Sequence, residues 1–77
     1  MNAKRLVPDR IENMIVHTIN SGKNLFTWNG FSVDLRKELD RKYCREVLEI
    51  SLKQYRVGIY YGSNTKETLE KCLQSLQ

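Results

Sequence analysis

The chain has 77 residues, of which 40% are hydrophobic and 29% are charged, a composition typical of one small globular domain with little room for a deep substrate pocket. Thirteen Lys and Arg residues against nine Asp and Glu residues give a net charge of +4, which favours polyanionic or acidic partners. No apolar run approaches the roughly 18 residues that span a bilayer, and the first ten residues lack the apolar segment of a signal peptide, so we expect a cytoplasmic protein without a membrane partner.

The first eight residues differ from the rest of the chain. They show no hydrophobic periodicity and carry two adjacent cations, Lys4 and Arg5. We therefore expect a flexible arm over residues 1–8 that can contact an anionic partner, followed by a single domain over residues 9–77.

A first helix is predicted to open at Pro8 and Asp9, because proline suits a first turn and a carboxylate stabilises the positive end of the helix dipole. Its apolar stripe at helical spacing consists of Ile11, Met14, Ile15, Thr18 and Ile19, and Asn20, Ser21 and Gly22 are expected to end it.

The segment LFTWNGFSV, residues 25–33, predicts a β-hairpin. Asn29 and Gly30 tolerate the positive φ angles of a type I′ turn. The four side chains that would then share one face are Phe26, Trp28, Phe31 and Val33. We expect this face to lie in the core; in the alternative, Trp28 or Phe31 is a stacking platform for a base or a partner.

Residues 34–56 contain neither Gly nor Pro, which permits one long helix. Its apolar residues fall into two sets that are rotated relative to each other. The first set is Leu35, Leu39 and Tyr43, and the second is Cys44, Val47, Leu48, Ser51, Leu52 and Tyr55. Either a broad face is buried or the helix breaks near residues 41–44, and we favour the continuous helix because no strong breaker is present. A broken helix would allow a helix-turn-helix with residues 45–56 as recognition helix, but Glu46 and Glu49 would then repel phosphates.

The run VGIYY, residues 57–61, is rich in β-formers between Gly58 and Gly62 and predicts a third strand. Asn64 with Glu67 resembles a capping box, in which Ser63 can share the role. A last helix would follow, with Leu69, Cys72, Leu73 and Leu76 on one face.

The expected fold is therefore α+β, in the order α-β-β-α-β-α. A three-stranded sheet, formed by the hairpin of residues 25–34 and the strand of residues 57–61, would be covered by the helices.

The sequence argues against an enzyme, a metal site and a bound cofactor. His17 is the single histidine, and we expect it on the helix surface, since one histidine supports neither a triad nor a zinc site. No glycine-rich phosphate-binding motif occurs. Cys44 and Cys72 lie within apolar helical patterns and are expected to be buried, reduced thiols, with a disulfide between them as the alternative.

One constellation suggests binding. Lys37, Arg41 and Arg45 recur at every fourth position and would line one face of the long helix, with Arg36 and Lys42 beside them. Such a row can follow phosphates. In the competing interpretation these cations belong to a solvated face and pair with glutamates at i, i+4 spacing.

We therefore expect a small non-enzymatic binding module with a regulatory role that docks on DNA or RNA through this row. The arm cations, and whichever of Tyr60 and Tyr61 faces outward, would assist. The alternative is a protein-interaction module, either an inhibitor or adaptor that covers an acidic surface, or a homodimer that pairs the edge of the VGIYY strand.

Overall fold

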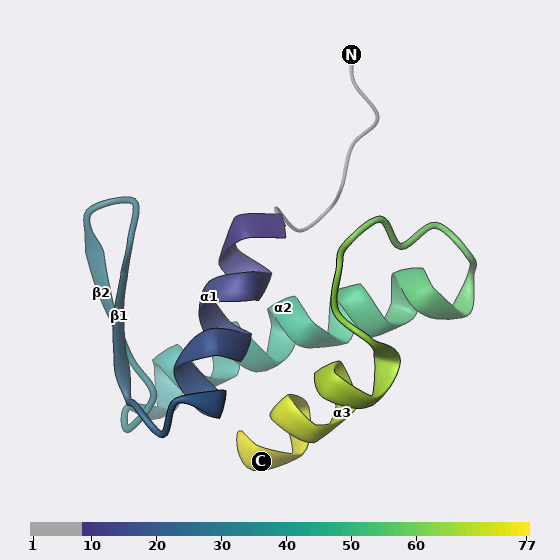
Figure 1. The fold of residues 1–77 in the computed structure, drawn as a ribbon. Coiled ribbons are helices and arrows are strands. Elements are labelled where there is room, and N and C mark those ends of the chain that lie inside the picture. Colours follow the sequence, from purple (N-terminus) through teal and green to yellow (C-terminus); the bar gives the residue numbers. More distant parts are fainter. Residues whose placement is uncertain (1–8) are drawn as a thin grey trace.

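The computed structural model describes residues 9–77, so the predicted arm with Lys4 and Arg5 lies outside the described residues. The elements in chain order are α1 (Asp9–Asn20), β1 (Leu25–Trp28), β2 (Phe31–Asp34), α2 (Glu38–Arg56) and α3 (Lys66–Ser75). Helices α1 and α3 pack on the same side of α2, and the hairpin stands beside α1 near the start of α2 (Figure 1). The fold is a small α+β domain with three helices and a two-stranded antiparallel sheet, and none of the described helices is long and apolar enough to cross a membrane.

The hairpin forms as the turn residues predict. Asn29 and Gly30 adopt φ angles of 50° and 80°, as a type I′ turn requires, and Trp28 pairs with Phe31. The prediction that all four side chains on this face enter the core is wrong for Phe31, which is 73% exposed. The helices cover Phe26 and Val33 at the base of the hairpin, whereas the turn projects at the edge of the molecule (Figure 1).

The predicted third strand is wrong, because its residues end α2 instead of pairing with the hairpin. Val57 is the C-cap, and Gly58 follows it with a φ of 79°. The Gly58 amide donates to the Tyr55 carbonyl and the Ile59 amide donates to the Gln54 carbonyl, at 3.1 and 2.9 Å. These two bonds form a Schellman motif, which needs a left-handed residue that glycine supplies at low cost.

Helix α2 runs without interruption from Glu38 to Arg56, which confirms the continuous helix and removes the split that a helix-turn-helix requires. It begins four residues later than predicted. The Asp34 carboxylate accepts a hydrogen bond from the Arg36 amide at 2.9 Å, and the Lys37 amide donates to the Asp34 carbonyl at 3.0 Å. This local turn competes with helical bonding and delays the helix.

The predicted capping box of Asn64 and Glu67 is not formed, and the N-cap lies one residue later than predicted. Thr65 is the N-cap of α3, and its hydroxyl accepts from the Thr68 amide at 3.1 Å. The Asn64 side chain does not cap α3. It donates hydrogen bonds to Glu12 at 2.7 Å and to Asn13 at 2.9 Å.

The core lies where the three helices and the base of the hairpin meet. Its buried apolar members are Ile11, Ile15, Val16, Phe26, Val33, Leu35, Cys44, Val47, Leu48, Leu52, Leu69, Cys72 and Leu76. Cys44 and Cys72 are free thiols, as predicted, and burial raises the pKa of Cys44 to about 11, so this thiol stays protonated at neutral pH.

Candidate interaction surfaces

Two of the three cations in the predicted row share one carboxylate. The Arg41 guanidinium lies 2.5 Å from one Glu38 oxygen, and the Arg45 guanidinium lies 2.8 Å from the other. The two guanidiniums also donate to carbonyls, that of Arg41 to Leu35 at 3.4 Å and that of Arg45 to Leu76 at 2.8 Å. The hydrogen bonds from Arg45 and Arg41 hold the pKa of Glu38 below its usual range. Both guanidiniums are therefore partly neutralised and held in place.

The remaining cations of the set do not extend this row. Lys37 is the N-cap of α2 and has extended backbone angles, so it precedes the helical line. Arg36 pairs with Asp34 at 2.9 Å, and this contact lowers the pKa of the carboxyl. Lys42 is exposed and takes part in no ion pair within residues 9–77.

The described residues carry only half of the net charge. Two of the 13 cations, Lys4 and Arg5, precede residue 9, whereas all nine acidic residues follow residue 8, and 11 cations minus nine acids leave +2. The other half of the net charge of +4 lies on Lys4 and Arg5, outside the described residues.

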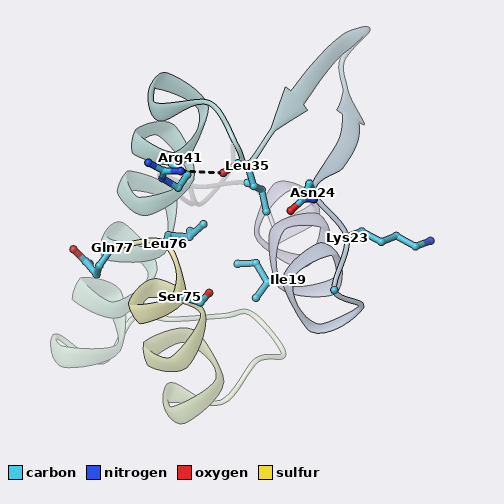
Figure 2. Close-up of a pocket in the computed structure, with 9 residues that line it drawn as sticks. Ile19, Lys23, Asn24, Leu35, Arg41, Ser75, Leu76 and Gln77 are labelled. Atoms are coloured by element: carbon cyan, nitrogen blue, oxygen red, sulfur yellow. Dashed lines mark hydrogen bonds between the residues drawn. The ribbon is translucent and has the colours of Figure 1, made fainter.

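An open hollow of about 410 Å³ lies between the end of α1, the start of α2 and the C-terminal end of α3 (Figure 2). Arg41 and Leu35 form one wall, and Ile19 and Leu76 lie opposite. The Lys23 side chain points away from it (Figure 2). The hollow holds one partly neutralised guanidinium beside the carbonyl end of α3, a helix end that disfavours an anion. We assign no ligand to it.

A different side of α2 presents apolar side chains to solvent. Leu39 is 79% exposed, Tyr43 is 42% exposed, Val57 is 62% exposed, and Ile59 just beyond the helix is 51% exposed. At about 100° per residue, the positions that recur along this side are Leu39, Tyr43, Glu46, Ile50, Lys53 and Val57, which we call the outer face of α2. Most of the buried residues of α2 lie on the adjoining side, against α1 and α3. Buried Gln54 borders the outer face, and Ile50 is half-buried and packs against the core.

The outer face is hollowed at its C-terminal half. Ile50, Lys53, Gln54 and Val57 surround an apolar depression of about 200 Å³, with Ile59 at its rim. The three helical positions and the C-cap Val57 have the i, i+3, i+4, i+7 spacing of the holes that receive side chains in packed helix pairs. The depression therefore has the shape that accepts a side chain from another helix.

The hairpin tip is a second exposed aromatic feature. Phe31 is exposed, and the Arg10 guanidinium lies 5.8 Å from the Trp28 ring centroid, in a cation–π contact. A shallow groove of about 420 Å³ separates Trp28 from Met14 and His17 of α1. His17 is exposed, as predicted.

The two tyrosines after α2 have opposite orientations. Tyr61 is 74% exposed. Tyr60 turns inward, where its ring stacks on Tyr55 at a centroid distance of 4.3 Å and its hydroxyl donates to Glu12. Of the two, Tyr61 is therefore the one available to a partner.

The acidic group at the centre of the fold is closed to substrates. Glu12 is fully buried, and its carboxylate accepts hydrogen bonds from Ser51 at 2.5 Å, from Asn64 at 2.7 Å and from Tyr60. These hydrogen bonds hold Tyr60 and Asn64, which follow α2, against Glu12 of α1, and we assign the cluster a structural role.

The outer face of α2 is not among the surfaces that the sequence pattern predicts. The change of phase between the two apolar sets is the signal for it, although that change also fits a broad buried face or a break in the helix. In the structure Leu35 is buried before the helix begins, and Leu39 and Tyr43 remain exposed.

Comparison of the chain with known protein families, curated proteins and solved structures gave no match.

Proposed function

We propose that the protein is a protein-interaction module that docks through the outer face of α2. The observation that carries this proposal is the exposure of Leu39, Tyr43 and Val57 on one side of a single continuous helix. Scattered apolar side chains are ordinary on protein surfaces, whereas an apolar row beside an apolar depression is typical of helix-in-groove recognition.

The proposal is tested by changing the outer face without disturbing the fold. Leu39→Glu places a carboxylate in the first turn of α2, and Val57→Lys places a cation at its end, and both charges suit the helix dipole. Each variant should keep the helicity of the wild type and lose about tenfold or more in affinity for partners captured from a nuclease-treated extract. Leu25→Glu is the matched control, because Leu25 is 54% exposed but lies on the hairpin. Equal capture by all three variants would contradict the proposal.

Docking on nucleic acid through Lys37, Arg41 and Arg45 is a second proposal. It is supported by the exposure of Lys37 and Lys42, neither of which takes part in an ion pair among the described residues. Removal of the shared carboxylate by Glu38→Gln frees two guanidiniums, so affinity for duplex DNA or structured RNA at low salt should rise.

The reverse change tests the same surface. Replacement of Lys37, Arg41 and Arg45 together by Gln should abolish most of the salt-sensitive binding. Binding that ignores both Glu38→Gln and the triple replacement would remove this second proposal.

A further inference from the structure

We infer that the outer face of α2 binds the same face of a second copy of this chain, with the two helices antiparallel about a twofold axis at Ile50. The inference rests on the proposed function and names the partner of that surface. It follows from the order of residues on the face, which is self-complementary.

The apolar side chains are placed symmetrically about Ile50. Tyr43 lies seven residues before it and Val57 seven residues after it, so each is about 10.5 Å away along the helix axis. In an antiparallel pair, Tyr43 of one copy therefore meets Val57 of the other at each end of the contact. Beyond these positions Leu39 at one end and Ile59 at the other extend the apolar surface.

The charged side chains on the same face have opposite signs on the two sides of the axis. Glu46 lies four residues before Ile50 and Lys53 three residues after it, about 6 and 4.5 Å along the axis. An antiparallel pair brings Glu46 of each copy to the level of Lys53 of the other. A parallel pair would set Glu46 against Glu46 and Lys53 against Lys53, an arrangement that like-charge repulsion disfavours.

Both charged side chains are available for this contact. Glu46 and Lys53 are exposed, and neither takes part in an ion pair within residues 9–77. The depression between Ile50 and Val57 provides the apolar surface against which the partner helix packs.

Charge reversal separates this arrangement from other modes of assembly. Glu46→Lys and Lys53→Glu, each alone, create two like-charge contacts per dimer, whereas the double variant restores both pairs with their signs exchanged. Sedimentation equilibrium from about 10 µM to about 1 mM should show a wild-type dimer. We expect dissociation constants raised about tenfold or more for each single variant and returned to within about threefold of wild type by the double variant.

The controls are Glu70→Lys and Lys71→Glu, which make the same changes in net charge at exposed positions of α3. They should leave the dissociation constant unchanged, and helicity should be equal in all variants. Isotope-filtered NMR of a half-labelled dimer should show contacts between Tyr43 of one copy and Val57 of the other. Contacts between Tyr43 and Tyr43, or a double variant no better than the single ones, would overturn the inference.

The proposal that the outer face of α2 docks a protein and the inference that this protein is a second copy can fail separately. A chain that is monomeric up to about 1 mM while Leu39→Glu still abolishes capture of another protein would overturn the second copy as partner and leave the docking face intact. A dimer that is insensitive to Glu46→Lys and to Lys53→Glu, together with equal capture of other proteins by Leu39→Glu, Val57→Lys and Leu25→Glu, would overturn both.

Discussion

Replacement of Glu12 by Ala should remove a large part of the stability of this domain. The carboxylate accepts hydrogen bonds from Ser51, Tyr60 and Asn64, and a hydrogen bond to a charged group contributes about 1.5 to 3 kcal/mol. Tyr60 and Asn64 are only partly buried, so water can replace part of what they lose. We therefore expect a loss of about 3 kcal/mol, against a total of roughly 4 to 12 kcal/mol for a domain of this length.

The assay is urea denaturation followed by far-ultraviolet circular dichroism, with the free energy of unfolding extrapolated to water. Glu70→Ala, at an exposed position of α3, is the control and should change this free energy by less than about 0.5 kcal/mol. A double-mutant cycle of Glu12→Ala with Tyr60→Phe should give a coupling energy of about 1 kcal/mol or more. A loss below about 1 kcal/mol for Glu12→Ala, with no coupling to Tyr60, would refute the central role of this cluster.

Three further predictions concern single positions. Gly58→Ala should lower the free energy of unfolding by about 1 kcal/mol in thermal melts, because the φ of 79° strains any residue with a Cβ; an unchanged melting temperature would contradict the observed helix end. Phe26→Ala should cost about 3 kcal/mol or more and Phe31→Ala less than about 0.5 kcal/mol; equal losses would contradict the observed burial. The hydrogen bond from Arg45 lowers the pKa of Glu38, so its stabilising contribution is present above the usual pKa of 4.5 and is lost as pH falls through the folded-state value. In Glu38→Gln the free energy of unfolding should therefore fall less than in the wild type as the pH is lowered. An equal fall in both proteins would contradict the ion pairs of Glu38 with Arg41 and Arg45.

Local signals in the sequence were sufficient for the hairpin and for three helices. The Asn29–Gly30 turn and the alternation around it predict the strand register that the structure shows, because both depend on neighbours within a few residues. The prediction of a strand at residues 57–61 is wrong because the same local signal fits two structures. VGIYY has the composition of a strand, but Gly58 directly after a long helix is also the signature of a Schellman motif, and the second interpretation is correct.

For the cation row, the spacing of residues in the sequence predicts the side of the helix but not the contacts that the guanidinium groups make. The spacing of Arg41 and Arg45 along α2 is as predicted, yet both turn toward Glu38, and Arg45 also reaches the Leu76 carbonyl 31 positions away. Helical spacing fixes the side of the helix from which a long side chain departs. The contacts at its far end depend on which other elements lie nearby.

The sequence alone determined the identity and approximate limits of the helices and hairpin, because turn chemistry and hydrophobic periodicity act over a few residues. In the C-terminal half of α2 the periodicity also identified most residues that face the core, whereas Leu39 and Tyr43 of the same pattern remain exposed. Tertiary structure decided the rest. It placed Glu12 against Asn64, 52 positions later, and left Phe31 and the outer face of α2 uncovered. The physical reason is that a side chain is buried only if another element lies over it, and a chain of this length covers one side of its longest helix and leaves the other exposed.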